Sequence, residues 1–125
     1  MKDLRILLVE HNAWARKLEM HMLRKIDNVK QVIAMPNGIA ALNILQYDYH
    51  ISLIVSCAHM PVMNGFDLVR NLAQRGLLAI PVIMISNDIS MQDKAMQVGA
   101  YEFLAKPLRQ EKLDEAIERA ASMLL

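Results

Sequence analysis

Several features that commonly define a function are scarce or missing in this sequence. It has one cysteine, so no internal disulfide can form, and a reducing cytoplasm is the expected location. Its 14 basic and 13 acidic side chains nearly cancel, which removes the simplest argument for nucleic-acid or anionic-membrane binding. No apolar run approaches the roughly 18 residues of a membrane span. Neither a signal-peptide pattern nor a glycine-rich phosphate loop is present.

The composition that remains is typical of one folded domain. The chain has 125 residues, of which 54% are apolar, so we expect a single domain over residues 1–125 with one core. Its ten methionines are expected to fill gaps in that core. Because residues 120–125 are largely apolar, we expect the last helix to continue into a linker or to pack on a partner. The domain would then be the N-terminal regulatory module of a longer protein.

Short apolar runs alternate with helical patterns along the whole chain. The runs occupy residues 5–9, 29–34, 51–56, 80–85 and 101–105. Such alternation predicts an α/β fold with a parallel sheet and helices on both faces. At this length the common arrangement is flavodoxin-like, a doubly wound sheet with strand order 2-1-3-4-5 and five helices.

The first helix is expected to begin after Asn12, whose side chain can cap it. Helical spacing suggests that four apolar residues face the core, namely Ala15, Leu18, Met22 and Ile26. The same reasoning places Glu19 in water and treats Trp14 as a partly buried packing residue.

Two later helices carry capping signals as well. Asn64 is expected to open the third helix. Ser90 and Asp93 match a capping box at the start of the fourth helix, and Gly99 is expected to end it.

The predicted strand order brings five polar residues to one crevice. In an open α/β sheet, ligands bind beyond the carboxyl ends of the strands, where the order reverses. The first and third strands meet there. Glu10 and His11 should therefore face Cys57, with Ser86 and Lys106 at the ends of the fourth and fifth strands.

Four segments give the chain a resemblance to a known family. They read ILLVEHN, LIVSCAHMPVMNG, IMISND and VGAYEFLAKP. In these motifs and in its five-fold strand–helix spacing the chain closely resembles the response-regulator receiver domain. This CheY-like domain is the phosphoacceptor module of two-component signalling, and the resemblance covers essentially all 125 residues.

The resemblance implies a site that this chain has largely lost. In the family, two adjacent acids and an aspartate hold Mg²⁺, and the aspartate accepts a phosphoryl group from a histidine kinase. Here the acidic pair reads Glu10-His11, and the acceptor position is Cys57. Mg²⁺ prefers oxygen ligands, and a thiol forms no acyl phosphate. We therefore expect a degenerate pseudo-receiver, without Mg²⁺ or another cofactor, without phosphorylation and without enzymatic activity.

Other positions keep the family pattern. Ser86 matches the hydroxyl residue that bonds the phosphoryl group, Lys106 the lysine that pairs with that group, and Phe103 the aromatic residue whose rotamer reports activation. Without a phosphoryl group, Lys106 can pair with Glu10. Family members usually carry a cis peptide bond before the proline at position 107.

Cys57 allows three other interpretations. Together with Glu10, His11 and His59 it supplies ligand types that Zn²⁺ favours. The spacing matches no zinc motif, however, and His59 should point outward, so no metal site is expected. A phosphatase cradle, Cys-x5-Arg, is excluded because Met63 stands in place of the arginine.

The third interpretation is redox sensing. Proximity to Lys106 could lower the pKa of Cys57. An inert, half-buried thiol is the simpler expectation. The alternative function kept open is a switch that senses a metal or an oxidant through Cys57.

If the crevice is silent, function must depend on a contact surface. The resemblance points to the fourth helix, fifth strand and fifth helix. Adaptable side chains on the fourth helix include Met91, Met96 and Gln97. Charges of both signs suit a homodimer or a protein partner, and they come from Arg109, Lys112, Glu115, Glu118 and Arg119.

Overall fold

The computed structural model describes residues 3–47, 50–77 and 79–124 of the chain. Five parallel strands form one sheet in the order β2-β1-β3-β4-β5, as the sequence predicts. They are β1 (Leu4–Val9), β2 (Val29–Met35), β3 (Leu53–Cys57), β4 (Val82–Ser86) and β5 (Glu102–Ala105). The predicted strand positions are thus confirmed to within about two residues at each end.

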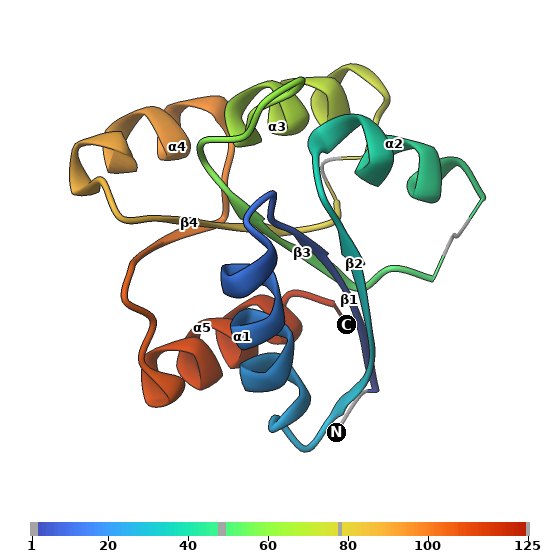
Figure 1. Ribbon diagram of the computed structural model, residues 1–125. Helices are drawn as coiled ribbons and strands as arrows, with labels where there is room; N and C mark the ends of the chain where they lie inside the picture. Colours follow the sequence, from blue (N-terminus) through green and yellow to red (C-terminus); the bar gives the residue numbers. More distant parts are fainter. Residues whose placement is uncertain (1–2, 48–49, 78, 125) are drawn as a thin grey trace.

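Five helices cover the two faces of this sheet. They are α1 (Ala13–Arg24), α2 (Gly38–Tyr47), α3 (Gly65–Gln74), α4 (Gln92–Val98) and α5 (Gln110–Ser122). Figure 1 shows α1 and α5 together on one face and α2, α3 and α4 on the other. This arrangement is the flavodoxin-like fold that the alternating pattern predicts.

The core lies between these layers and includes inner strands of the sheet. Every residue of β3 and of β4 is buried. Strands covered on both faces have this near-continuous apolar character. In the sheet register, Val9 pairs with Ser56, and Cys57 pairs with Ile85. The carboxyl ends of neighbouring strands therefore reach the same edge of the sheet.

The orientation of α1 differs from the prediction. Leu18 is 60% exposed, whereas Glu19 is 4% exposed and Trp14 is 84% exposed. The interpretation of Leu18 as core, of Glu19 as solvated and of Trp14 as partly buried is therefore wrong. Residues 15, 19, 22, 23 and 26 share one stripe at a period of 3.6 residues, and that stripe includes Glu19 and excludes Leu18.

The predicted caps are confirmed except at the start of the fourth helix. The Asn12 side chain accepts a hydrogen bond from the Ala15 amide (2.9 Å), and Asn64 caps α3 in the same way. Gly99 ends α4 in the left-handed region (φ 114°). The fourth helix, however, is preceded by a 3₁₀ turn (Ile89–Met91) that Asp88 caps, so the expected Ser90–Asp93 capping box is wrong. The Asp88 carboxylate accepts from both the amide (3.0 Å) and the hydroxyl (2.6 Å) of Ser90.

Within residues 3–47, 50–77 and 79–124, every helix is too short or too polar to cross a membrane. Among the described strands, β2 and β5 form the two edges of the sheet.

Candidate functional site

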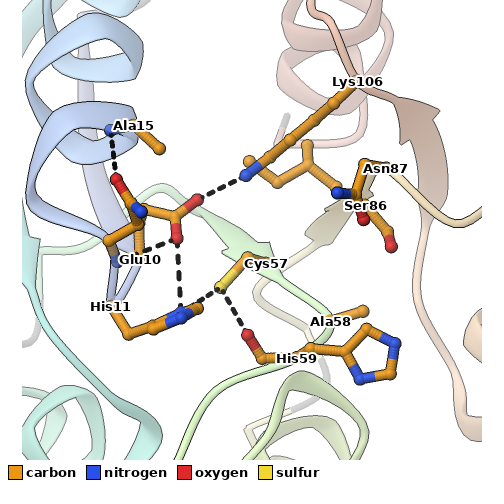
Figure 2. Close-up of a pocket in the computed structure, with 11 residues that line it drawn as sticks. Glu10, His11, Ala15, Cys57, Ala58, His59, Ser86, Asn87 and Lys106 are labelled. Carbon is orange, nitrogen blue, oxygen red and sulfur yellow. Dashed lines mark hydrogen bonds and ion pairs between the residues drawn. The ribbon is translucent and has the colours of Figure 1, made fainter.

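A pocket of about 350 Å³ opens at the carboxyl edge of the sheet. Figure 2 shows its side chains converging from the ends of β1, β3, β4 and β5. Its lining comprises Glu10, His11, Asn12, Ala15, Cys57, Ala58, His59, Ile85, Ser86, Asn87 and Lys106. The five polar residues that the topology assigns to one crevice therefore do meet there.

The link between β1 and α1 positions Glu10 and His11. The Glu10 amide donates to the Met35 carbonyl (3.0 Å), which ties the end of β1 to β2. The Asn12 amide then donates to Oε2 of Glu10 (3.2 Å), and Arg16 donates to the Glu10 carbonyl (2.8 Å). These contacts hold the Glu10 side chain at 1% exposure, while that of His11 remains 44% exposed at the pocket rim.

A tight loop after β3 holds Cys57 against this pair. The Ala58 amide donates to the Ile85 carbonyl (2.9 Å), and the Gly65 amide donates back to the Ala58 carbonyl (2.9 Å). A Cβ atom on Gly65 would lie 2.5 Å from the Cys57 carbonyl oxygen, so this approach requires glycine. The Cys57 thiol donates to the His59 carbonyl (3.5 Å), and its Sγ lies 3.9 Å from Nδ1 of His11.

Lys106 bridges two buried carboxyl groups. Its Nζ lies 2.7 Å from Oε1 of Glu10 and 3.3 Å from Oε2 of Glu19. The expected Lys106–Glu10 pair is therefore confirmed. Oε1 of Glu19 has no hydrogen-bond partner among the described residues. The Lys106–Pro107 peptide bond is cis, as the resemblance implies.

The two carboxyl groups titrate in opposite directions. Burial raises the pKa of Glu10, but the contacts with Lys106, then with Glu19 and then with the Asn12 amide together outweigh burial and leave that pKa below its usual value. Burial, and then the negative charge of Glu10, raise the pKa of Glu19 to about 8. Glu10 is therefore the ionised partner of Lys106, and Glu19 holds a proton at neutral pH.

Sequence reasoning missed Glu19 as a member of this site. The signal was its position four residues after Ala15 and three before Met22, on the stripe of α1 that faces the sheet. A carboxyl group on such a stripe is rarely buried without a partner. Lys106, 87 positions further along the chain, supplies that partner.

The surroundings of Cys57 argue against a reactive thiol. Burial, and then the negative charge of Glu10, raise the pKa of Cys57 to about 12. Lys106 has only a small opposing effect because its charge is already paired with Glu10. The expectation of a lowered pKa for Cys57 is therefore wrong, and a redox sensor, which needs a thiolate, is not favoured.

The remaining predicted residues lie around or behind the pocket. Ser86 is buried at the end of β4, and its hydroxyl accepts from the Asp88 amide (3.0 Å). Phe103 is buried on β5 and does not line the pocket. The His59 ring points away from Cys57 and packs edge-on against Phe66, with 6.4 Å between ring centroids (Figure 2). The outward orientation expected for His59 is thus confirmed.

The donor atoms in the crevice do not match the needs of Mg²⁺. This hard ion prefers octahedral coordination by carboxylate and water oxygens. Lys106 occupies Oε1 of Glu10, so Glu10 offers the crevice one oxygen, Oε2, and the other two ligand atoms grouped with it are the His11 nitrogen and the Cys57 sulfur. These residues therefore do not fit the ion that the family resemblance implies.

Comparison with known proteins gives several partial matches. A rice protein, Two-component response regulator-like PRR73 (Oryza sativa subsp. indica), is 35% identical over 117 residues, covering 90% of this chain and 15% of the relative. A protein-glutamate methylesterase/protein-glutamine glutaminase of Desulfotalea psychrophila is 33% identical over 123 residues, covering 96% of this chain and 33% of the relative. The chain therefore spans a minor part of these curated relatives.

Solved structures and a family profile agree with that match. The chemotaxis protein CheY4 of Vibrio cholerae superposes with a TM-score of 0.83 at 26% identity, covering 94% of this chain and 98% of that one. The profile of the response regulator receiver domain matches residues 6–118. The chain belongs to the response regulator receiver domain family of two-component signalling.

Proposed function

We propose that this receiver domain is a pseudo-receiver, which signals through protein contacts without aspartyl phosphorylation, without Mg²⁺ and without enzymatic activity of its own. The observation that carries the proposal is the identity of the residue at the mouth of β3. Cys57 stands there, with its sulfur facing Glu10 and His11. An acyl phosphate needs a carboxylate oxygen at this position, and Cys57 has none.

The charge pattern of the crevice supports the same conclusion. In the family, the lysine at the position of Lys106 pairs with a phosphoryl group. Here its ammonium is already bonded to Glu10 and lies close to Glu19. An incoming phosphoryl group would have to displace a buried ion pair, which is costly because one charge would lose its partner.

We place the working surface on α4, β5 and α5. The edge position of β5 leaves its outer side available for pairing. Met96 is 45% exposed, and Gln97, Lys112 and Glu115 are exposed as well. A second copy of the chain or another protein that docks here specifically should bury about 800 Å² on each side.

In a longer protein, this domain would be a regulatory module beside an output domain. That view is supported by the long relatives, in which the matched segment is 15% or 33% of the length. The single free cysteine favours a location in the reducing cytoplasm, where a thiol stays reduced.

Intact-mass spectrometry after incubation with acetyl phosphate and Mg²⁺ tests the proposal. The wild-type chain should gain no phosphoryl group. Cys57→Asp should gain little, because His11 still occupies a position that needs an acid. Cys57→Asp combined with His11→Asp should gain clearly more. A phosphoryl group on the wild-type crevice would overturn the proposal.

Thermal unfolding gives an independent test. A ligand present at ten times its Kd stabilises the folded state by about 1.4 kcal/mol, which shifts the melting temperature by several degrees. Millimolar Mg²⁺ with beryllofluoride should leave the wild-type melting temperature unchanged. An upward shift that the Lys106→Met variant lacks would show that the crevice still recognises a phosphoryl group.

A further inference from the structure

Three side chains of different chemistry face one another across the crevice. Glu10, His11 and Cys57 each offer one ligand atom, and the three atoms all lie within 4.8 Å of one another. Figure 2 shows the three side chains converging on one point. We propose that this crevice binds one borderline-soft divalent ion such as Zn²⁺ through Oε2 of Glu10, Nδ1 of His11 and Sγ of Cys57.

Two of the three distances between ligand atoms are close to those that tetrahedral coordination requires. With metal–sulfur bonds of about 2.3 Å and metal–nitrogen or metal–oxygen bonds of about 2.1 Å, neighbouring ligand atoms lie about 3.4–3.6 Å apart. The Nδ1 atom of His11 lies 3.9 Å from Sγ of Cys57 and 3.5 Å from Oε2 of Glu10. All three ligand atoms lie within 4.8 Å of one another, so small rotations of the Glu10, His11 and Cys57 side chains would bring them to one ion. The spacing of these residues along the chain matches no zinc motif, but their arrangement in the folded chain favours a metal site.

The two oxygens of Glu10 have separate partners. Oε1 bonds to Lys106, while Oε2 faces His11 and accepts a hydrogen bond from the Asn12 amide. Lys106 can therefore keep its own bond and orient the carboxylate when Oε2 binds a metal, as outer partners of metal ligands do. The Glu10 backbone is held by Met35 and Arg16, so the ligand is positioned before the ion arrives.

Binding of the metal ion requires the crevice to lose one proton. The Cys57 thiol loses its proton to bulk water as the sulfur–metal bond forms, because a coordinating thiol is deprotonated. The hydrogen bond from the thiol to the His59 carbonyl is lost in the same step. No electron is transferred, since Zn²⁺ has no redox chemistry.

Three protein ligands leave the fourth position to water. The pocket of about 350 Å³ has room for it, and the half-exposed His11 ring marks the entry. His59 does not supply the fourth ligand, because its ring packs against Phe66 and faces away from Cys57. An open fourth position would allow a small anion or a partner's side chain to bind the same ion. This inference goes beyond the proposed function, which requires no ligand.

Cobalt substitution tests the site with the metal alone. The metal-free chain should bind one Co²⁺ and develop a near-ultraviolet thiolate-to-cobalt charge-transfer band, which Zn²⁺ abolishes and millimolar Mg²⁺ does not. Cys57→Ser should abolish the band. His11→Gln should weaken binding by about tenfold or more, since even the loss of an outer partner costs that much. The matched control His59→Gln should bind as the wild type does.

Several results would overturn the inference. These are the absence of the band in the wild-type chain, equal affinity in His11→Gln and wild type, and displacement of Co²⁺ by Mg²⁺. If Cys57→Ser fails to fold, X-ray absorption of the wild-type zinc complex is measured instead. One sulfur at about 2.3 Å from the zinc is expected, and the absence of a sulfur ligand would overturn the inference. Failure here would leave the acetyl phosphate result untouched, so the two proposals fail separately.

Discussion

Two charged clusters include a residue of β5 or the residue that follows it, and the two differ in burial far more than in the distance between the charged atoms. In the crevice cluster, Lys106 lies 2.7 Å from Glu10, and the two side chains are 24% and 1% exposed. In the surface cluster, Arg119 of α5 lies 2.6 Å from Glu102 of β5, with side chains 49% and 22% exposed. Each cluster also includes a second carboxyl group, Glu19 in the first and Glu115 in the second.

This difference separates a fixed region from one that can change partners. Removing one partner of a buried pair leaves a charge without compensation, which is strongly unfavourable. An exposed pair is screened by water and contributes little, so its members can exchange partners at low cost. The crevice cluster therefore suits a constant scaffold or a bound ion. The surface cluster suits a contact that forms and breaks.

The largest expected effect comes from Lys106→Met. It leaves the ionised Glu10 buried without its cation, so the free energy of unfolding at neutral pH should fall by about 4 kcal/mol. Urea denaturation measures this directly. The matched control is Arg119→Met, which should cost at most about 1 kcal/mol because its pair is exposed. Equal losses in the two variants would remove the distinction between the clusters.

The second effect is a dependence of stability on pH. Folding raises the pKa of Glu19 from 4.5 to about 8, so the folded chain binds more protons than the unfolded chain between these values. Stability should therefore be greatest near pH 4.5 and should fall as the pH rises through 8. The fall should be on the order of 2 kcal/mol, because the charges of Glu10 and Lys106 readjust as Glu19 ionises. In buffer that contains a chelator, Glu19→Gln should weaken this dependence of stability on pH. A wild-type stability that rises over the same range would contradict the prediction.

A third effect concerns association through the proposed face. Lys112→Glu on α5 should weaken self-association, or binding to the natural partner, by about tenfold (~1.4 kcal/mol) and leave the melting temperature unchanged. Arg119→Glu should also weaken association, but it breaks the pair with Glu102 and will lower stability slightly. The control is Lys30→Glu on β2, at the opposite edge of the sheet. Light scattering that shows a monomer, with partner binding unaffected, would reject this face.

The smallest effect is the expected absence of a switching motion. Phe103 is buried, and the Ser86 hydroxyl already accepts a hydrogen bond from the Asp88 amide. A two-state element responds only to a ligand that binds its two states differently. Phe103 should therefore occupy one dominant rotamer in the free chain. Exchange broadening at Phe103 and Ser86 in relaxation-dispersion NMR would show that the family's switch survives.

Much of the scaffold could be predicted because its causes are local or topological. Asn12 and Asn64 cap helices through contacts only three residues long, so neighbouring sequence determines them. Five strand–helix units in a parallel sheet leave few possible strand orders. That order alone brings Glu10, His11, Cys57 and Lys106 to one edge, although they are distant in the chain.

Only the tertiary structure decided which side of α1 faces the crevice and what the buried groups there can do. Leu18 and Glu19 both fit a helical stripe in the sequence, and packing against the sheet selected Glu19. The pKa of about 12 for Cys57 and of about 8 for Glu19 depend on burial and on the charge of Glu10. Burial and charge–charge distances are properties of the assembled core, because electrostatic energy depends on separation in space and on the surrounding medium.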